Sequence, residues 1–130
     1  MSDTVRERPI DFRIFKDIEI PEITVPAGST ILAEGGDGAI MFMVRSGTVE
    51  VQVNGAVVEE ISEGGIFGEM ALLEHSPRSA DIIAKTDVVA VSLDEKKFII
   101  LIAKVPHFSL LVMRSLARRI RKMNAKLAVK

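Results

Sequence analysis

The sequence predicts a mainly β domain that ends in helices, and three observations support this. Short apolar segments alternate with turns from Glu19 to Leu93, a spacing typical of sandwiches, jelly rolls and barrels. Asn54-Gly55 lies between two valine-rich runs, which is a strong signal for a two-residue hairpin turn. After Asp94 the apolar residues recur at helical spacing, so helices should follow the strands.

A roll of eight strands, or nearly so, is expected, and the sequence places seven of them, separated by turns rich in Gly, Pro and Asn. Their expected ranges are residues 23–25, 31–32, 40–45, 49–53, 57–61, 81–84 and 88–93. Within the fourth range, Val49, Val51 and Val53 share one face of the strand. They are either core residues or, in the case of Val51, part of the wall of an internal pocket. In a barrel both can hold, and Val58 on the next strand is expected in the same wall.

Two helices should follow these strands. Asp94 is a suitable N-cap for a short helix over residues 95–104, and Pro106 separates it from a long helix over about residues 107–126. Apolar residues on the long helix alternate at spacings of three and four: Met113, Leu116, Ile120, Met123 and Leu127. This predicted seam either packs on the strands of the same chain or pairs with a second copy in parallel. The charged remaining faces favour the dimer.

Length and composition indicate one domain over residues 1–130, with strands in about 19–93 and helices in about 94–127. The chain has no cysteine, which excludes disulfides, thiolate metal sites and a cysteine nucleophile. Its first residues are charged, and no apolar run approaches the ~20 residues of a membrane span. A cytoplasmic location is therefore expected.

The charges are divided unevenly along the chain. All 18 acidic residues lie at or before Glu95, whereas residues 114–130 carry seven Lys or Arg residues and no acid. This basic tail can match the helix dipole and keep exposed faces solvated, or it can bind an acidic surface on the body or on a partner protein. Direct DNA binding is not expected, because neither aromatic residues nor a helix-turn-helix accompany the charge.

Glycines, one carboxylate and one arginine come together between residues 64 and 80. Glycines permit turns whose N–H groups approach an anion closely, and a helical turn after Glu69 would add partial positive charge. Arg78 is a permanent, forked cation suited to two phosphate oxygens. Glu69 would repel that phosphate, so it is expected to accept a hydrogen bond from a neighbouring hydroxyl. The pattern predicts a pocket for a sugar phosphate.

The run Phe67-Gly-Glu-Met-Ala-Leu-Leu, followed by Pro77-Arg-Ser-Ala, resembles the phosphate-binding cassette of the cyclic nucleotide-binding domain family. The segment from Arg78 to Thr86, Phe98, and Leu116-Ala-Arg-Arg-Ile resemble the sensor half of bacterial catabolite activator proteins. The resemblance covers about residues 25–124. It implies an antiparallel β-roll (a jelly roll, or double-stranded β-helix), then a short helix and a long C-terminal helix through which two copies pair. It also implies that the DNA-binding domain of those relatives is missing here.

The resemblance also assigns ligand contacts. Backbone N–H groups of Gly68, Met70 and Ala71 would contact the phosphate of a cyclic nucleotide, which Arg78 would neutralise. Glu69 would hold the ribose 2′-OH. The full set expected at the ligand is Phe67, Gly68, Glu69, Met70, Ala71, Arg78, Ser79, Ala80, Val51, Val58, Met123 and Asn124.

The base contact departs from the family pattern. Met123 and Asn124 stand where a Thr-Ser pair holds adenine in the relatives. Asn124 can both donate to and accept from an adenine edge, or it can be a solvated polar residue, while Met123 could only pack on the ring. Ser79 is compatible with adenine or guanine. We expect cAMP rather than cGMP.

A stand-alone cyclic nucleotide sensor is therefore predicted, which relays binding by repacking its C-terminal helices. No cofactor or metal is expected, and no enzyme, because no partnered nucleophile and no Gly-Lys-Ser/Thr phosphate loop occurs in the sequence. One alternative is a β-roll interaction or dimerisation protein that has lost nucleotide binding. Another is the sensor part of a split transcription regulator.

Overall fold

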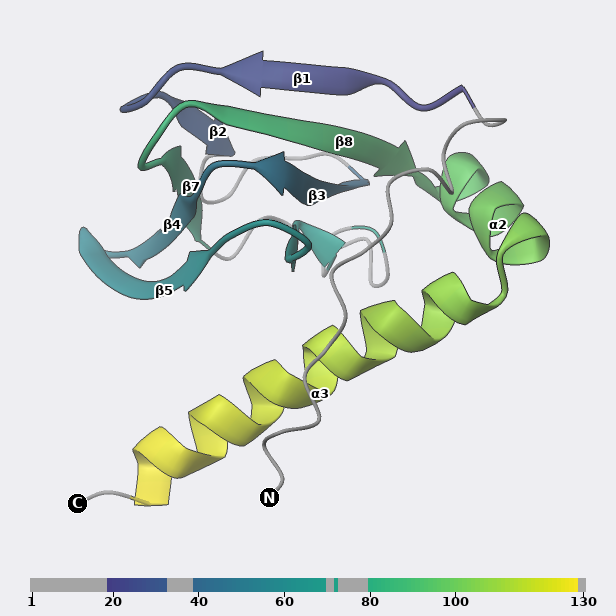
Figure 1. Cartoon of the computed structure of the whole chain (residues 1–130). Helices are drawn as coiled ribbons and strands as arrows, with labels where there is room; N and C mark the ends of the chain where they lie inside the picture. The colour runs from purple at the N-terminus through teal and green to yellow at the C-terminus, as the bar shows by residue number, and fades with distance from the viewer. Residues whose placement is uncertain (1–18, 33–38, 70–71, 73–79, 129–130) are drawn as a thin grey trace.

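A computed structural model describes residues 19–32, 39–69, 72 and 80–128. Within these residues the chain forms strands and then helices (Figure 1). The strands are β1 (Glu22–Val25), β2 (Thr30–Leu32), β3 (Ile40–Ser46), β4 (Val49–Val53), β5 (Ala56–Ile61), β6 (Ile66–Phe67), β7 (Asp81–Ala84) and β8 (Val88–Asp94). The helices are α2 (Glu95–Lys104) and α3 (His107–Ala128).

The strands form two four-stranded sheets, ordered β1-β8-β3-β6 and β2-β7-β4-β5, and the paired strands run antiparallel. This confirms the predicted antiparallel roll followed by a short and a long helix. The hairpin signal is also confirmed, because Asn54 and Gly55 both have positive φ, as a two-residue turn between twisted strands requires. The two-residue strand β6 was not predicted, since it is defined only by its pairing with β3.

Strand β3 divides the core into two parts, because its successive side chains point to opposite faces. Met41 and Met43 pack with Leu101, Phe108 and Val112 of the helices, and we call this group the outer core. The alternate residues of β3 pack between the sheets in the inner core, which comprises Phe42, Val44, Val49, Ile61, Phe67, Ile82, Ala84, Val88 and Ala90. The helices are thus joined to the roll through one face of a sheet that is buried on both sides.

The two helices begin as the sequence predicts. The Asp94 side chain accepts a hydrogen bond from the backbone N–H of Lys97 at 2.8 Å, and this bond lowers the pKa of the Asp94 carboxyl. Helix α3 then runs beneath the roll on the side of β5 (Figure 1). Among the described helices, none is long and apolar enough by itself to span a membrane; α2 and α3 pass that test only as a pair, and they meet at a bend of 119°.

Two glycines with nearly the same φ provide a matched test of the roll. Gly47 has φ of 92°, and a Cβ added there would lie 2.2 Å from the carbonyl oxygen of Asp87. Gly28 has φ of 90° and no atom within 4 Å of such a Cβ. We expect Gly28→Ala to lower the free energy of unfolding by about 1 kcal/mol and Gly47→Ala by about 3 kcal/mol, in urea unfolding. Equal losses would contradict the close approach at Gly47.

Candidate ligand-binding site

Glu69 is the buried charged residue of the described part of the chain, with 2% of its surface exposed. It lies two residues after the end of β6, and the backbone is helical at both Glu69 and Leu72, the described residues of the predicted helical turn. A carboxylate at such depth requires a cation or several hydrogen-bond donors. Its partner comes from the far end of the sequence.

That partner is Arg119 of α3. Its Nη1 donates to Glu69 Oε1, and its Nη2 donates to the carbonyl oxygen of Ile66 in β6. Its Nε lies 3.4 Å from Glu59 Oε2 on β5. Burial lowers the pKa of the Arg119 guanidinium, and the neighbouring Glu59 partly opposes this shift. One guanidinium therefore ties the long helix to β5, β6 and the acid that follows β6.

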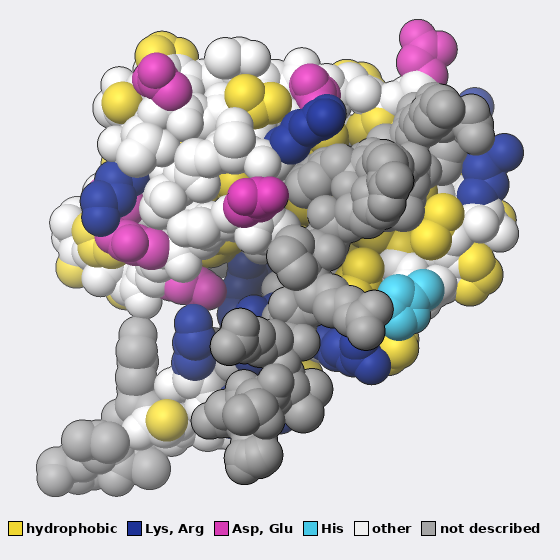
Figure 2. Space-filling model, viewed as in Figure 1, with side chains coloured by type: hydrophobic (Ala, Val, Ile, Leu, Met, Phe, Trp, Pro, Cys, Tyr) yellow, Lys and Arg dark blue, Asp and Glu magenta, His cyan; other side chains and the backbone are white. Residues whose placement is uncertain are grey.

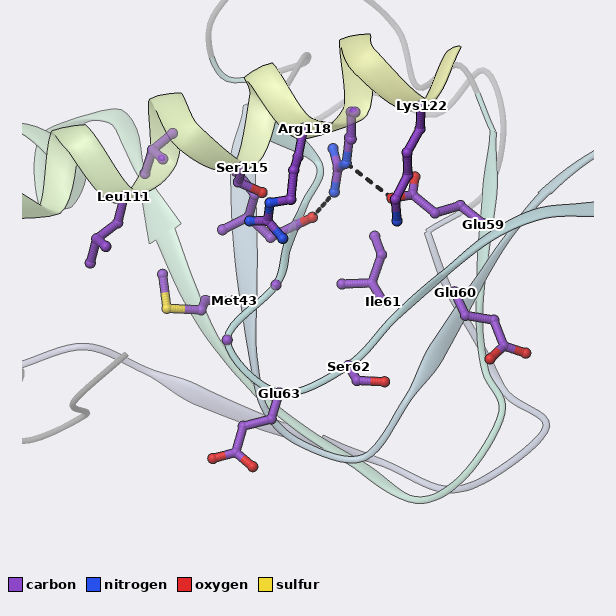
Figure 3. A pocket seen from close by; sticks show the side chains of 15 residues that line it. Met43, Glu59, Glu60, Ile61, Ser62, Glu63, Leu111, Ser115, Arg118 and Lys122 are labelled. Atoms are coloured by element: carbon purple, nitrogen blue, oxygen red, sulfur yellow. Dashed lines mark hydrogen bonds and ion pairs between the residues drawn. The ribbon is translucent and has the colours of Figure 1, made fainter. Parts of the chain in front are cut away.

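A cavity of about 360 Å³ adjoins this ion pair, between α3 and the turn that follows β5 (Figure 3). The dashed lines in Figure 3 mark hydrogen bonds and ion pairs among the residues of its wall, where the labelled Glu59 lies opposite α3. The wall is mixed, with apolar residues from the core and charged residues of both signs. It comprises Met43, Glu59, Glu60, Ile61, Ser62, Glu63, Gly64, Gly65, Ile66, Leu111, Val112, Ser115, Arg118, Arg119 and Lys122.

The predicted ligand contacts lie in several environments, and those whose side chains the structure describes do not line this cavity. Phe67 is 1% exposed and stacks on Phe42 in the inner core, with ring centroids 5.1 Å apart. Val51 is half-buried against the inner core, whereas Val58 is 42% exposed. Gly68 has φ of 81°, Ala80 is half-buried, and Asn124 is exposed. Met70, Ala71, Arg78, Ser79 and the side chain of Met123 lie outside the described residues.

Arg119 was not predicted as a site residue, because in the sequence it is one of the tail cations and one of two adjacent arginines in the Leu116-Ala-Arg-Arg-Ile segment, with nothing local to single it out. A signal was available. Phe108 and Val112 are buried, and Leu116 packs against the outer core, at a spacing of four residues. Arg119 continues this stripe by three residues, so a charge falls on the face of α3 that packs on the roll. A cation in that position requires an acid on the roll.

The predicted apolar seam of α3 is divided between two environments. Leu116 packs against the outer core of its own chain, whereas Met113 is 56% and Ile120 is 58% exposed. The side chains of Met123 and Leu127 lie outside the described residues. Part of the predicted seam thus packs on the roll of the same chain, and part is exposed and available to pair with a second copy.

The basic tail partly faces the acidic body of its own chain. Figure 2 shows Lys and Arg side chains of α3 opposite Asp and Glu side chains of the roll. Arg119 forms ion pairs with Glu59 and Glu69 of the roll. Arg114, Arg118, Arg121 and Lys122 are exposed, so they can still meet an acidic partner protein, which stays a prediction.

The fold and site define a β-roll binding module closed by a helix. Residues 22–105 match the family model described as "Cyclic nucleotide-binding domain", and the chain belongs to that family. The matched residues include β1 to β8 and α2 but not α3.

Three relatives illustrate the family. The chain is 44% identical over 78 residues to a cAMP-dependent protein kinase regulatory subunit of Aspergillus niger, with 58% of this chain and 19% of that protein covered. The Thermus thermophilus catabolite activator protein is 26% identical, with a TM-score of 0.72 over 88% of this chain and 61% of that chain. A structure reported for a cyclic-GMP-dependent signalling pathway in bacterial phytopathogenesis is 25% identical, with a TM-score of 0.68 over 77% of this chain and 84% of that chain. The chain covers between 15% and 33% of the length of four of the curated relatives that it matches.

Proposed function

We propose that this chain is a non-catalytic sensor that binds a cyclic purine nucleotide, cAMP in preference to cGMP, and relays binding through α3. The observation that carries this proposal is the buried Glu69, which is paired with a cation of the long helix. A ligand hydroxyl that reaches Glu69 interacts with the same carboxylate as Arg119. A ligand at Glu69 therefore changes how α3 is held on the roll. A relay requires such a difference in contacts between the empty and the bound state.

Gly68 and Arg78 hold the phosphate in this proposal, and Glu69 accepts from the ribose 2′-OH. The positive φ of Gly68 supports a close backbone approach to an anion. The preference for cAMP is supported by the relative named as cAMP-dependent. The exposed Asn124 is available to a base at the surface of α3. The cytoplasmic location and the single domain over residues 1–130 stay predictions.

Thermal melting with cAMP, cGMP and 5′-AMP tests this function. A ligand at about 100-fold excess over its Kd should stabilise the folded chain by about 2.7 kcal/mol. We expect that stabilisation for cAMP at the lowest concentration, then for cGMP, and none for 5′-AMP, whose phosphate is not cyclised. The absence of a shift with both cyclic nucleotides would contradict the proposal and favour a β-roll interaction protein.

We propose further that two copies pair in parallel through α3. The proposed seam keeps Met113 and Ile120 of the predicted seam but uses different residues between and around them. The exposed residues at spacings of three and four are Leu110, Met113, Ala117, Ile120 and Asn124. Leu116 leaves the seam because it packs on its own roll.

Ile120→Lys should break this dimer. The charge would have to be buried between two copies of the same helix, so we expect the dimer dissociation constant to rise by tenfold or more, roughly. Ile99→Lys on α2 is the matched control, because Ile99 is 57% exposed and Ile120 is 58% exposed. Sedimentation equilibrium measures both variants. A parent chain that is monomeric at high concentration, or equal effects of both variants, would rule out pairing along this seam.

A further inference from the structure

Helix α3 has three sides, and one of them is basic. Its buried side carries Phe108 and Val112, and its exposed apolar side carries Met113 and Ile120. Between these sides lies a row of exposed cations, each three or four residues from Arg118, so they share one side of the helix. We call this row the basic stripe, and it consists of Arg114, Arg118, Arg121 and Lys122. Because a helix rises about 1.5 Å per residue, the stripe is about 12 Å long.

The charge of the basic stripe is not balanced within its own helix. Residues 114–130 contain no acid, so no carboxylate lies three or four residues further along to pair with these cations. Among the described ion pairs, none involves Arg114, Arg121 or Lys122. On the facing wall of the cavity, the side chain of Glu63 points away from α3 (Figure 3). Most of the positive charge of the stripe is therefore available to a partner.

The cavity beside α3 adjoins the basic stripe. Arg118 and Lys122 belong to its wall, and in Figure 3 both side chains extend from α3 toward the turn after β5. The apolar part of the wall comprises Met43, Ile61, Ile66, Leu111 and Val112. A cavity of about 360 Å³ accommodates an apolar side chain of a partner. This side of the molecule thus combines an apolar pocket with cations at its rim.

We propose that the basic stripe and this cavity together bind a short acidic segment of a partner protein. One apolar side chain of the segment enters the cavity, and carboxylates on either side of it pair with the stripe. The enclosed apolar side chain supplies much of the affinity, whereas the exposed charge pairs orient the segment and speed its association. This binding requires no nucleotide, so it goes beyond the proposed function and is testable without it.

A short acidic segment fits this surface better than a nucleic acid does. A DNA duplex carries one negative charge per about 1.7 Å of its axis, so it continues well past the basic stripe. Beside the stripe it meets the acidic roll, where Glu59, Glu60 and Glu63 line the same cavity. A short segment can place its few carboxylates on the stripe alone. The exposed apolar side of α3 stays free to pair with a second copy.

Fluorescence anisotropy with a labelled peptide tests the charges of this surface. The peptide has glutamates on both sides of a single leucine, and it is titrated without nucleotide at low ionic strength. We expect the double variant Arg118→Gln with Lys122→Gln to bind the peptide roughly tenfold more weakly than the parent chain does. The double variant Arg45→Gln with Lys104→Gln is the matched control, because both residues are exposed and lie outside the stripe. It should change the affinity by less than about twofold.

Ser115→Leu tests the cavity separately from the charges. Ser115 is half-buried and lines the cavity, so a leucine there fills space that the peptide side chain would occupy. The parent chain should bind the leucine peptide roughly tenfold more tightly than the same peptide with serine in place of leucine. The variant should bind both peptides alike. Circular dichroism of each variant verifies that the roll is folded.

Three results would overturn the proposal. The first is equal weakening by the two double variants, or no binding of either peptide by the parent chain. The second is equal binding of the leucine and serine peptides by the parent chain, which would remove the cavity from the surface. The third is tighter binding of a DNA duplex than of the leucine peptide under the same conditions, which would assign the basic stripe to nucleic acid.

Discussion

Arg119→Met lowers the free energy of unfolding by about 3–5 kcal/mol, because it leaves a buried carboxylate without its cation. Methionine retains an unbranched apolar stem like that of arginine, so the result reports on charge and hydrogen bonding more than on lost packing of the stem. Glu69 is 2% exposed, and the Ile66 carbonyl loses a donor in the same variant. Urea unfolding at pH 7 measures the change, which is expected without any ligand.

Two further variants make the result specific. Arg118→Met removes the same charge from the neighbouring residue, which is exposed, and should cost less than about 1 kcal/mol. Adding Glu69→Gln to Arg119→Met removes the unpaired charge and should recover most of the lost stability. If Arg119→Met costs no more than Arg118→Met, the ion pair does not hold α3 on the roll.

Most of the fold was predictable because its signals are local. The Asn54-Gly55 turn, the Asp94 cap and the period-two pattern of the strands each depend on neighbouring residues. Strand β6 was not predictable in this way. Ile66 and Phe67 become a strand because Met43 and Phe42 lie opposite them, at a separation of more than twenty residues in the sequence.

The site was predictable only in part, for a similar reason. The residues between Gly64 and Ala80 are contiguous and resemble a known cassette, so Glu69 could be singled out from the sequence. Its partner Arg119 is fifty residues away, and several other tail cations look alike in the sequence. Only the packing of α3 selects one of them. The same packing moves Leu116 out of the predicted seam and leaves Ile120 exposed.

The basic tail illustrates how one pattern divides among several roles. Arg119 pairs with the acidic body of its own chain, as one reading of the charge asymmetry suggested. Arg114 and Arg121 are exposed on the same helix. A stretch of like charges in a sequence is therefore read best one residue at a time, by the face of the helix on which each residue falls.

Arg78→Ala should remove most of the stabilisation by cyclic nucleotide while leaving the ligand-free stability nearly unchanged. Arg78 lies outside the described residues, so this expectation comes from the sequence. Two charge-assisted hydrogen bonds to phosphate are worth roughly a hundredfold in affinity, at the least. At a concentration of about 100 times the parent Kd, the stabilisation would fall from about 2.7 to about 0.4 kcal/mol.

Arg45→Ala is the control for this variant, because Arg45 is an exposed arginine that pairs with Glu22 at the surface. It should keep the full ligand-induced shift in thermal melting. A full shift in Arg78→Ala would mean that the phosphate lies elsewhere. The two arginine variants also separate two roles. We expect Arg119→Met to destabilise the ligand-free protein, because this cation pairs with acids of the fold. We expect Arg78→Ala to act chiefly when ligand is present, because this cation would pair with the phosphate.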